Sequence, residues 1–255
     1  ITKFEVQNFT AFTDLRISFH KGINILLGEN GTGKTHIMKV LYSACSIVDK
    51  RVDTSFDQKL KEVFLPNTIG RLVHRKKGRN SSTIKIGRTD ETSKEHTISC
   101  TITTLNNVNI TTKGWKDEQK IETVFIPVKD MLANAPGFRA LYAQKELYYE
   151  GVYADIIDKA FIPFPRGKQE PQIAKLLSIL QKAMSGRVVT KNENFYLKNA
   201  MGELEFPLLA EGFRKLGLLY TLICNGTLTK GTVLFWDEPE ANLNPKLAKT
   251  LVQML

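Results

Sequence analysis

Cysteine is scarce in this sequence of 255 residues, and long apolar runs are missing from it. The three cysteines, Cys45, Cys100 and Cys224, are widely spaced, and no Cys-x-x-Cys pair or His/Cys cluster indicates a structural metal. We therefore expect reduced, partly buried thiols, as in a cytoplasmic protein. No apolar run could span a bilayer and no signal peptide is visible, so we expect no membrane partner.

Internal repeats, low-complexity segments and long heptad runs are also missing, so no solenoid or coiled coil is predicted. Acidic residues are outnumbered, because 36 Lys and Arg against 26 Asp and Glu give a net charge of +10. A basic balance is compatible with nucleic acid, an anionic membrane surface or simple solubility, and it selects none of these. The length suits one large domain or two lobes.

Alternating apolar residues at the start of the chain predict a β-hairpin formed by residues 1–9 and 14–19. A short apolar strand is predicted over residues 23–27, and it runs directly into a glycine-rich turn. The apolar spacing after this turn predicts a helix that ends near Val48. A strand, a glycine turn and a helix in this order are typical of a phosphate-binding unit.

The stretch from residue 51 to residue 114 is rich in Thr, Ser, Lys and Asn. Short β-like runs at residues 83–86 and 96–103 predict an antiparallel β subdomain with exposed loops. The densest basic run of the chain, RLVHRKKGR at residues 71–79, lies inside it. This run is either a solvated loop or a surface that contacts phosphate groups.

The second half of the chain is predicted to mix helices with short strands, and prolines at 163, 165 and 171 interrupt its helical pattern. The predicted elements are, in order, a strand at 123–127, helices within 129–184, hairpin strands at 188–206 with turns at 192–194 and 200–202, a helix at 208–224, a strand at 232–236 and a helix from Pro245.

The run GENGTGKT at residues 28–35 matches G-x-x-x-x-G-K-[ST] at every fixed position. Its glycines let the backbone turn so that successive N–H groups face inward, and the helix that follows adds its positive dipole end. Lys34 would reach the β- and γ-phosphates of ATP, and Thr35 would offer its hydroxyl to Mg²⁺. The predicted nucleotide contacts in this turn are Gly28, Glu29, Asn30, Gly31, Thr32, Gly33, Lys34, Thr35 and His36.

Four apolar residues followed by two carboxylates form the run VLFWDE at residues 233–238. This is the Walker B pattern, in which a buried strand delivers its acids at its C-terminal end. Asp237 would hold Mg²⁺ through water, and Glu238 would be the catalytic base that polarises the attacking water. An acidic cap before Pro239 is the alternative, and the match at residues 28–35 favours the catalytic interpretation.

The run DEPEANLNP at residues 237–245 resembles the Walker B and D-loop of ABC-type P-loop ATPases of the SMC/RecF/OLD group. Residues 1–12 resemble the start of that group, where Asn-Phe-Arg is common, although Thr10 stands in place of the Arg. The resemblance covers both ends of the chain well and residues 51–184 loosely. It implies an α/β fold, namely an ABC-type ATPase head with a P-loop core sheet, an antiparallel β subdomain and a helical lobe.

On this basis we divide the chain into four parts. They are the N-terminal strands and P-loop at 1–50, a β-rich insertion at 51–128, a helical lobe at 129–185, and the signature-like helix with Walker B and D-loop at 186–255.

The run LAEGFRKL at residues 209–216 resembles the signature helix of these ATPases, which reaches the ATP held by another subunit. Ala210 stands where a Ser is usual, and Glu211 and Gly212 follow it. The resemblance implies that Glu211 and Gly212 contact the nucleotide of a second subunit, because glycine permits close approach and a helix N-terminus faces phosphate. An ordinary amphipathic helix is the alternative.

Two elements of the group are not placed by the sequence. Gln144 is a candidate for the glutamine that senses Mg²⁺, and a solvated helix position is the alternative for it. The switch histidine is expected beyond the D-loop, past the end of this chain, and the four histidines present do not suit that role. The chain starts at Ile1 and ends within a predicted helix, so we expect it to be trimmed at both ends. No carboxylate cluster of the TOPRIM nuclease kind is visible.

The resemblance implies a switch in which ATP joins two heads, as a homodimer or a higher homo-oligomer, and hydrolysis releases them. The leading hypothesis is a sensor and scaffold ATPase that controls an effector protein, a toxin or a nuclease, in bacterial anti-phage defence. The first alternative is a RecF-like repair ATPase that binds duplex DNA. The second is a module that binds ATP for structural purposes and does not hydrolyse it.

Overall fold

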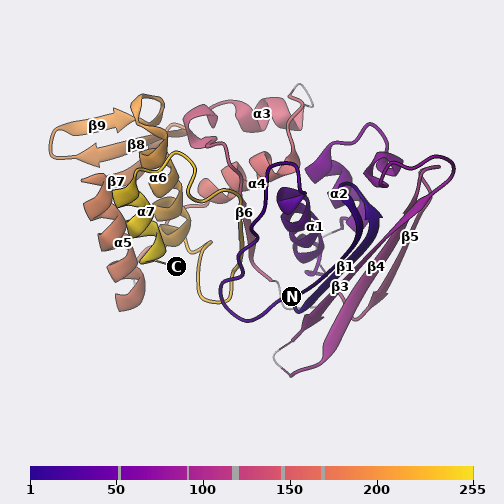
Figure 1. Ribbon diagram of the computed structural model, residues 1–255. Coiled ribbons are helices and arrows are strands. Elements are labelled where there is room, and N and C mark those ends of the chain that lie inside the picture. The colour runs from indigo at the N-terminus through magenta and orange to yellow at the C-terminus, as the bar shows by residue number, and fades with distance from the viewer. Residues whose placement is uncertain (51–52, 91, 117–120, 145–146, 168–169, 255) are drawn as a thin grey trace. The chain divides into compact units, whose positions relative to one another are not determined.

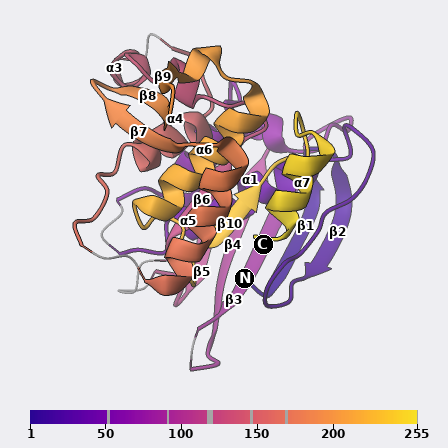
Figure 2. The same cartoon turned by 90° about the vertical axis from the view of Figure 1, so that its left-hand side faces the viewer.

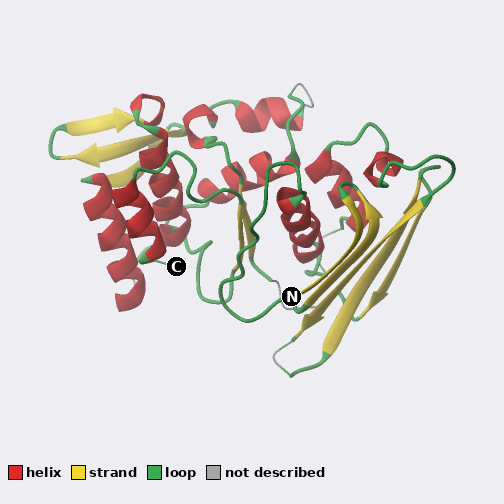
Figure 3. Cartoon of the chain, in the orientation of Figure 1, coloured by secondary structure: helices red, strands yellow, loops and turns green. Residues whose placement is uncertain are grey.

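The computed structural model describes residues 1–50, 53–90, 92–116, 121–144, 147–167 and 170–254 (Figure 1). The chain forms two compact units, residues 1–123 and residues 124–255. The first unit is built on a large sheet, and the second is mainly helical (Figure 3). The division of the sequence into four parts remains a prediction.

An antiparallel sheet of five strands is the framework of the first unit. Its spatial order is β2-β1-β3-β4-β5, so the N-terminal hairpin and the later β-rich stretch share one sheet. The strands are β1 (Lys3–Phe9), β2 (Phe12–Ser18), β3 (Ser81–Thr89), β4 (Glu95–Thr103) and β5 (Val108–Lys113). The predicted hairpin and both predicted β-like runs are therefore confirmed.

One face of this sheet is apolar because buried and exposed residues alternate along β3 and β4. Ile84 pairs with Cys100 and Ile86 pairs with Ile98, and all four side chains are buried. Complete burial of an aliphatic side chain stabilises a fold by about 1.5–3 kcal/mol. The sheet thus supplies half of the core of this unit.

Two helices supply the other half, since α1 (Lys34–Ser46) and α2 (Phe56–Phe64) lie on one side of the sheet (Figure 1). The sequence predicted α1 but not α2. The sequence does contain a signal for α2, because Ser55 and Gln58 form a reciprocal capping box at its start. A short 3₁₀ helix, η1 (Ile69–Leu72), leads from α2 toward β3.

The strand predicted at residues 23–27 is not formed. Its large exposed side chains are Ile23, Ile25 and Leu27. The Asn24 side chain accepts a hydrogen bond from the His20 N–H and donates to the His20 carbonyl, and this local turn competes with extended pairing. A strand also needs a ladder partner, and none of the described strands pairs with this segment.

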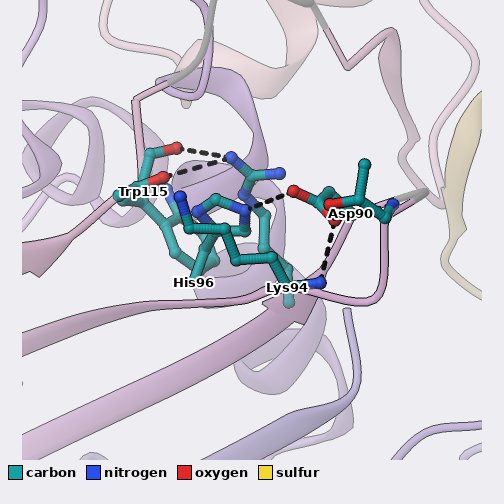
Figure 4. Close-up of polar contacts among 7 residues, drawn as sticks. Asp90, Lys94, His96 and Trp115 are labelled. Carbon is teal, nitrogen blue, oxygen red and sulfur yellow. Dashed lines mark hydrogen bonds and ion pairs between the residues drawn. The ribbon is translucent and has the colours of Figure 1, made fainter.

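The first unit contains a polar cluster that includes Asp90, His96 and Trp115 (Figure 4). His96 Nε2 lies 2.8 Å from Asp90 Oδ2, and this bond is the main reason that the pKa of Asp90 is lowered. Arg88 donates to the Trp115 carbonyl at 3.1 Å, and the Trp115 indole N–H donates to the carbonyl of Ala44 in α1 at 3.0 Å. Trp115 is fully buried, so the cluster fastens the sheet to α1 and has a structural role.

The three cysteines are free and buried, as predicted for reduced thiols. Burial raises the pKa of Cys45 to about 11 and that of Cys100 to about 12. Both groups are therefore neutral thiols at pH 7, and reactive thiolate chemistry is not favoured at either position.

The second unit contains five α-helices among its described residues. They are α3 (Phe138–Ala143), α4 (Gly151–Ala160), α5 (Pro171–Met184), α6 (Glu211–Cys224) and α7 (Pro245–Val252). Two 3₁₀ helices, η2 (Leu132–Asn134) and η3 (Phe206–Leu208), are also present. The helices α5, α6 and α7 lie side by side in both views, and α6 is almost entirely buried (Figures 1 and 2). No helix in the described part of the chain combines the length and the apolar character that a membrane crossing requires.

Two small sheets complete the second unit. β6 (Thr123–Ile126) pairs with β10 (Val233–Trp236), and both strands occur where the sequence predicted them. β7 (Arg187–Lys191), β8 (Asn194–Asn199) and β9 (Gly202–Glu205) form an antiparallel sheet. Two hairpin strands were predicted here, and a third is present because both predicted turns reverse the chain.

Candidate nucleotide site

The glycine-rich turn before α1 adopts the conformation that its glycines allow. The backbone φ angle is +156° at Gly28, +80° at Gly31 and +96° at Gly33, where a side chain would be strained. The Thr32 hydroxyl donates a hydrogen bond of 2.8 Å to the Glu29 carbonyl across the turn. The fixed glycines of the sequence motif thus have a conformational reason in the structure.

Lys34 is bound to the turn that precedes it. Its ammonium group donates to the carbonyl oxygens of Gly28 at 2.6 Å and Glu29 at 2.7 Å. At the same point α1 begins, with no side-chain cap at Gly33 and no acidic residue in its first turn. An ammonium group and uncapped helical N–H groups give this turn the chemistry of an anion site.

Phe12 of β2 packs closely against the glycine-rich turn. A Cβ atom on Gly33 would lie 2.5 Å from the Phe12 ring, so this glycine is required by close approach as well as by its φ angle. The backbone φ angle is also positive at Asn8 and Thr10, beside the β1–β2 turn from which Phe12 follows. The sheet therefore supports the turn directly.

The other predicted contacts of this turn lie in different settings. Glu29 and Asn30 are exposed on the turn, and Thr35 is half-buried in the first turn of α1. The His36 ring packs against Phe64 of α2, with 5.3 Å between ring centroids. The imidazole of His36 thus belongs to the packing of the unit, and its contact with a nucleotide remains a prediction.

The acidic turn follows β10 directly, as the sequence predicted. The Asp237 N–H donates to the Ile126 carbonyl at 3.0 Å, which fastens the start of the turn to β6. Asp237 is buried, whereas the Glu238 side chain is exposed and can meet water. Burial raises the pKa of Tyr153, and the charges of Glu150 and Asp237 act in the same direction.

Glu238 has a left-handed backbone with a φ angle of +45°, and Asn242 has one of +61°. Such a conformation costs a residue with a side chain about 1–2 kcal/mol. The Glu238 carbonyl accepts hydrogen bonds from the Ala241 N–H at 3.0 Å and from Lys215 Nζ at 3.1 Å. Lys215 Nζ also donates to the Ala241 carbonyl at 2.8 Å. Together these bonds hold the strained turn.

The predicted signature segment forms the start of α6. Ala210 is the N-cap residue and makes no side-chain cap, so the first N–H groups of α6 lack a side-chain partner at this position. A Cβ atom on Gly212 would lie 2.9 Å from the Asn242 carbonyl oxygen. Glycine is therefore needed here for the acidic turn to approach α6, a role that the sequence did not indicate.

Three charged residues beside the acidic turn were not predicted as functional. Lys215 is only 3% exposed, and Arg214 Nε lies 3.4 Å from Asp130 Oδ2. Burial raises the pKa of Asp130, while a backbone hydrogen bond from Leu132 and the charge of Arg214 oppose the rise. A signal for Lys215 does exist, because it follows Gly212 by three residues on the buried face of an apolar helix.

Gln144 is the C-cap residue of α3 and is exposed. This position suits the solvated alternative, and a role in sensing Mg²⁺ remains a prediction. No group of three or more His, Cys, Asp or Glu that could hold a metal ion occurs among the described residues. A second metal centre is therefore not visible in that part of the chain.

The basic run at residues 71–79 begins in η1, where Leu72 and the following Val73 are buried, and continues as a mostly exposed loop over residues 74–79 before β3. Lys76 Nζ donates to Asn8 Oδ1 at 2.7 Å, and His74 Nδ1 lies 2.7 Å from the Thr10 carbonyl oxygen. The loop therefore rests on the β1–β2 turn. The basic residues that it exposes are Arg75, Lys76, Lys77 and Arg79.

Parts of this chain are similar to known proteins. The AAA domain family matches residues 3–191. The DNA replication and repair protein RecF of Streptococcus suis is 36% identical over 80 residues, which are 31% of this chain and 21% of that protein. RecF of Bacillus cytotoxicus is 32% identical over 82 residues, which are 32% of this chain and 21% of that protein. The match thus spans only about a fifth of the length of these relatives.

Solved structures of SMC heads have a similar fold. The SMC head domain from Thermotoga maritima matches with a TM-score of 0.52 and 12% identity, over 99% of this chain and 82% of that one. An SMC head bound to the C-winged helix domain of ScpA matches with a TM-score of 0.58 and 13% identity, over 99% and 84%. At such identities the likeness concerns the fold alone, which is mixed α/β with an antiparallel sheet and helices.

The family match covers most of the chain, including the glycine-rich turn, and the SMC-head fold accords with it. The chain belongs to the AAA domain family, and within it to the ABC-type P-loop ATPases of the SMC and RecF group.

Proposed function

We propose that the protein binds ATP with Mg²⁺ at the glycine-rich turn and hydrolyses it. The observation that carries this proposal is the combination of Lys34 with the uncapped, acid-free start of α1. A polyphosphate is the ligand that suits an ammonium group beside inward-facing N–H groups. On binding, Lys34 exchanges two neutral carbonyl acceptors for charged phosphate oxygens, which form the stronger hydrogen bonds.

Thr35 and Asp237 are the residues that would hold Mg²⁺. Their hydroxyl and carboxylate oxygens are the hard ligands that this ion prefers. The ion, when bound, neutralises charge on the phosphate oxygens. Glu238 accepts the proton of the attacking water, and its exposed carboxylate on the acidic turn supports that role.

The start of α6 supports the part of the proposal that concerns oligomerisation. Ala210 leaves this helix end without a side-chain cap, and Glu211 and Gly212 are its first residues. We assign this end to the nucleotide of a second copy, so that ATP joins two heads of a homodimer and hydrolysis separates them. The resemblance of residues 209–216 to a signature helix supports this assignment.

We further propose that this switch controls an effector protein, a toxin or a nuclease, in bacterial anti-phage defence. The support is the resemblance of a compact head to bacterial ATPases of the overcoming-lysogenisation type and to those paired with toxins or nucleases. In this role the ATPase senses a trigger and holds the effector. The presence or absence of nucleotide then decides whether the effector stays bound.

The second candidate is a DNA-acting ATPase, and the basic loop at residues 71–79 favours it. No Asp or Glu occurs between Glu62 and Asp90, and seven Lys and Arg residues lie in that interval. Clustered cations on an exposed loop bind nucleic acid mainly through phosphate contacts. The RecF relatives, which are named for DNA replication and repair, point in the same direction.

Steady-state ATP hydrolysis, measured with and without duplex DNA, tests the main proposal. We expect turnover that Lys34→Ala abolishes, because the ammonium ligand of the phosphates is lost. We expect Glu238→Gln to bind ATP but turn it over about 10²–10⁴-fold more slowly, as the loss of a general base predicts. Binding of ATP without any turnover by the unchanged protein would favour the non-hydrolysing module instead.

DNA binding at several salt concentrations separates the two biological roles. In the DNA-acting role, replacing Arg75, Lys77 and Arg79 by Ala lowers the slope of log K against log salt by about 0.9 per lost phosphate contact. The matched control replaces three exposed lysines of the second unit, Lys175, Lys182 and Lys246. If no variant binds DNA and DNA does not change the ATP turnover of any of them, effector control is favoured.

A further inference from the structure

Lys215 connects α6 to the acidic turn. Its side chain is on the buried face of the helix and is only 3% exposed. Its ammonium group donates to the carbonyl oxygens of Glu238 at 3.1 Å and Ala241 at 2.8 Å. Both acceptors belong to the backbone, so the lysine acts on the path of the turn and not on a carboxylate.

A second contact joins the same helix to the same turn. Gly212, one helical turn before Lys215, approaches the Asn242 carbonyl so closely that a Cβ atom would lie 2.9 Å from it. Glu238 and Asn242, near the two ends of the turn, have left-handed backbones. The turn is thus held against α6 at both of its strained positions.

The surroundings of Lys215 suit a permanent contact. Burial lowers the pKa of its ammonium group, and the carboxylates of Glu211, Glu240, Glu238 and Asp130 oppose this effect. The neighbouring cation, Arg214, is directed to Asp130 instead. Within the turn, the Ala241 carbonyl oxygen accepts its hydrogen bond from Lys215. A side chain of similar size without a donor, such as methionine, would remove this bond from the partly buried acceptor.

We propose that Lys215 is a positioning residue for Glu238, which holds the backbone of the acidic turn so that the Glu238 carboxylate is directed at the attacking water. This inference rests on the proposed hydrolysis of ATP. It also links the start of α6 to the position of Glu238, because the Lys215 side chain joins this helix to the acidic turn. A second copy that engages the start of α6 therefore acts on the position of the base.

Three substitutions of Lys215 in the full protein test this inference. Arg keeps the charge and the donors, Gln keeps donors without the charge, and Met keeps neither. Lys246→Met is the matched control, because Lys246 is an exposed lysine just beyond the same turn. The readouts are kcat, KM, the Kd of a fluorescent ATP analogue, and hydrogen exchange of the backbone amides at residues 237–243 without nucleotide.

We expect kcat of Lys215→Met to fall about ten- to a hundredfold, as a misplaced catalytic group predicts. Its Kd for the nucleotide should stay within a factor of about three, because Lys215 is not part of the phosphate turn. Amide exchange at residues 237–243 should become faster, and Arg should restore more of the activity than Gln does. Lys246→Met should resemble the unchanged protein in all four readouts.

Two results would overturn the inference while the proposed function stands. One is an active unchanged protein whose Lys215→Met and Lys215→Gln variants have normal kcat. The other is unchanged amide exchange at residues 237–243. If Lys215→Met does not fold, as judged by circular dichroism, the Gln variant decides. Absence of turnover in the unchanged protein contradicts the proposed function, and amide exchange still tests the contact.

Discussion

Each of the two units contains a lysine whose ammonium group is bound to two backbone carbonyls of a tight turn. Lys34 binds Gly28 and Glu29 in the first unit, and Lys215 binds Glu238 and Ala241 in the second. Lys34 is half-buried, whereas Lys215 is buried. A contact near solvent can be exchanged for a ligand at little cost, while a buried one cannot. The same pair of bonds is therefore suited to exchange for a ligand in the first unit and to rigidity in the second.

The two turns also obtain their left-handed backbones in different ways. The phosphate turn uses glycines, which adopt positive φ angles without strain. The acidic turn has Glu238 and Asn242 at such angles, so part of its conformation is enforced by contacts with α6. The proposed function requires a carboxylate at position 238, which excludes glycine there. The bonds of Lys215 thus offset the strain of a residue with a side chain at this position.

Methionine in place of each lysine is the strongest test of this comparison. We expect Lys215→Met to lower the free energy of unfolding by about 3 kcal/mol, because two partly buried carbonyls lose the charged donor of a buried side chain. Lys34→Met should lower it by less than about 0.5 kcal/mol, since water replaces the ammonium group near the surface. Urea denaturation of both variants measures the difference. Equal losses in stability would show that the two contacts are of one kind.

Alanine in the phosphate turn tests whether glycine is needed for conformation or for space. Gly33→Ala meets both a φ angle of +96° and the Phe12 ring, so we expect a loss of about 2 kcal/mol. Gly31→Ala has a φ angle of +80° with no atom within 4 Å of its Cβ, and should lose about 1 kcal/mol. Urea denaturation of the two variants and of Gly33→Ala with Phe12→Leu measures this. Identical losses in all three would exclude a contribution from Phe12.

Most of the fold could be predicted because its elements carry local signals. The hairpin, α1, β6, α6, β10 and α7 all follow from apolar spacing, capping or flanking turns. The segment at residues 23–27 could not be judged from its apolar residues, because a strand depends on a partner elsewhere in the chain. The helix α2 lay in a stretch whose composition favours strands, and its capping box was the only local sign.

The candidate site also has parts that could be predicted from the sequence and parts that could not. The phosphate turn and the acidic turn are contiguous motifs, so their residues could be named from the sequence. Lys215 acts on carbonyls 23 and 26 residues away, and Gly212 on a carbonyl of Asn242. Such contacts depend on how α6 packs, and no short motif encodes them. The Asp130–Arg214 pair is likewise visible only in three dimensions.

Replacing Glu238 by glycine and by alanine tests how strained the backbone is at this position. Glu238→Gly and Glu238→Ala both remove the carboxylate, and they differ only in tolerance of a φ angle of +45°. We expect the glycine variant to be more stable than the alanine variant by about 0.5–1 kcal/mol, because glycine adopts this conformation freely. Thermal denaturation of the two proteins gives the difference. An alanine variant of equal stability would mean that the acidic turn is not strained.

A third turn, between β3 and β4, extends the comparison, because there a carboxylate holds the left-handed residue. Asp90 Oδ1 accepts hydrogen bonds from the N–H groups of Thr92 and Lys94, and Ser93 has a φ angle of +64°. Asp90→Asn keeps these acceptors but replaces the oxygen that faces His96, so we expect the smallest loss of stability in the series.

The pH dependence of that loss follows from the lowered pKa of Asp90. A carboxyl group whose pKa is lower in the folded state stabilises the fold above its unfolded pKa, which is about 4 for Asp. The contribution disappears as the pH falls through the lower, folded value. The unchanged protein should therefore be more stable than Asp90→Asn at pH 5. The difference between their free energies of unfolding should be smaller at pH 3. Urea denaturation at both values, with the exposed Asp14→Asn as control, measures it. An equal difference in free energy of unfolding at pH 5 and pH 3 would mean that His96 does not stabilise the charged form of Asp90.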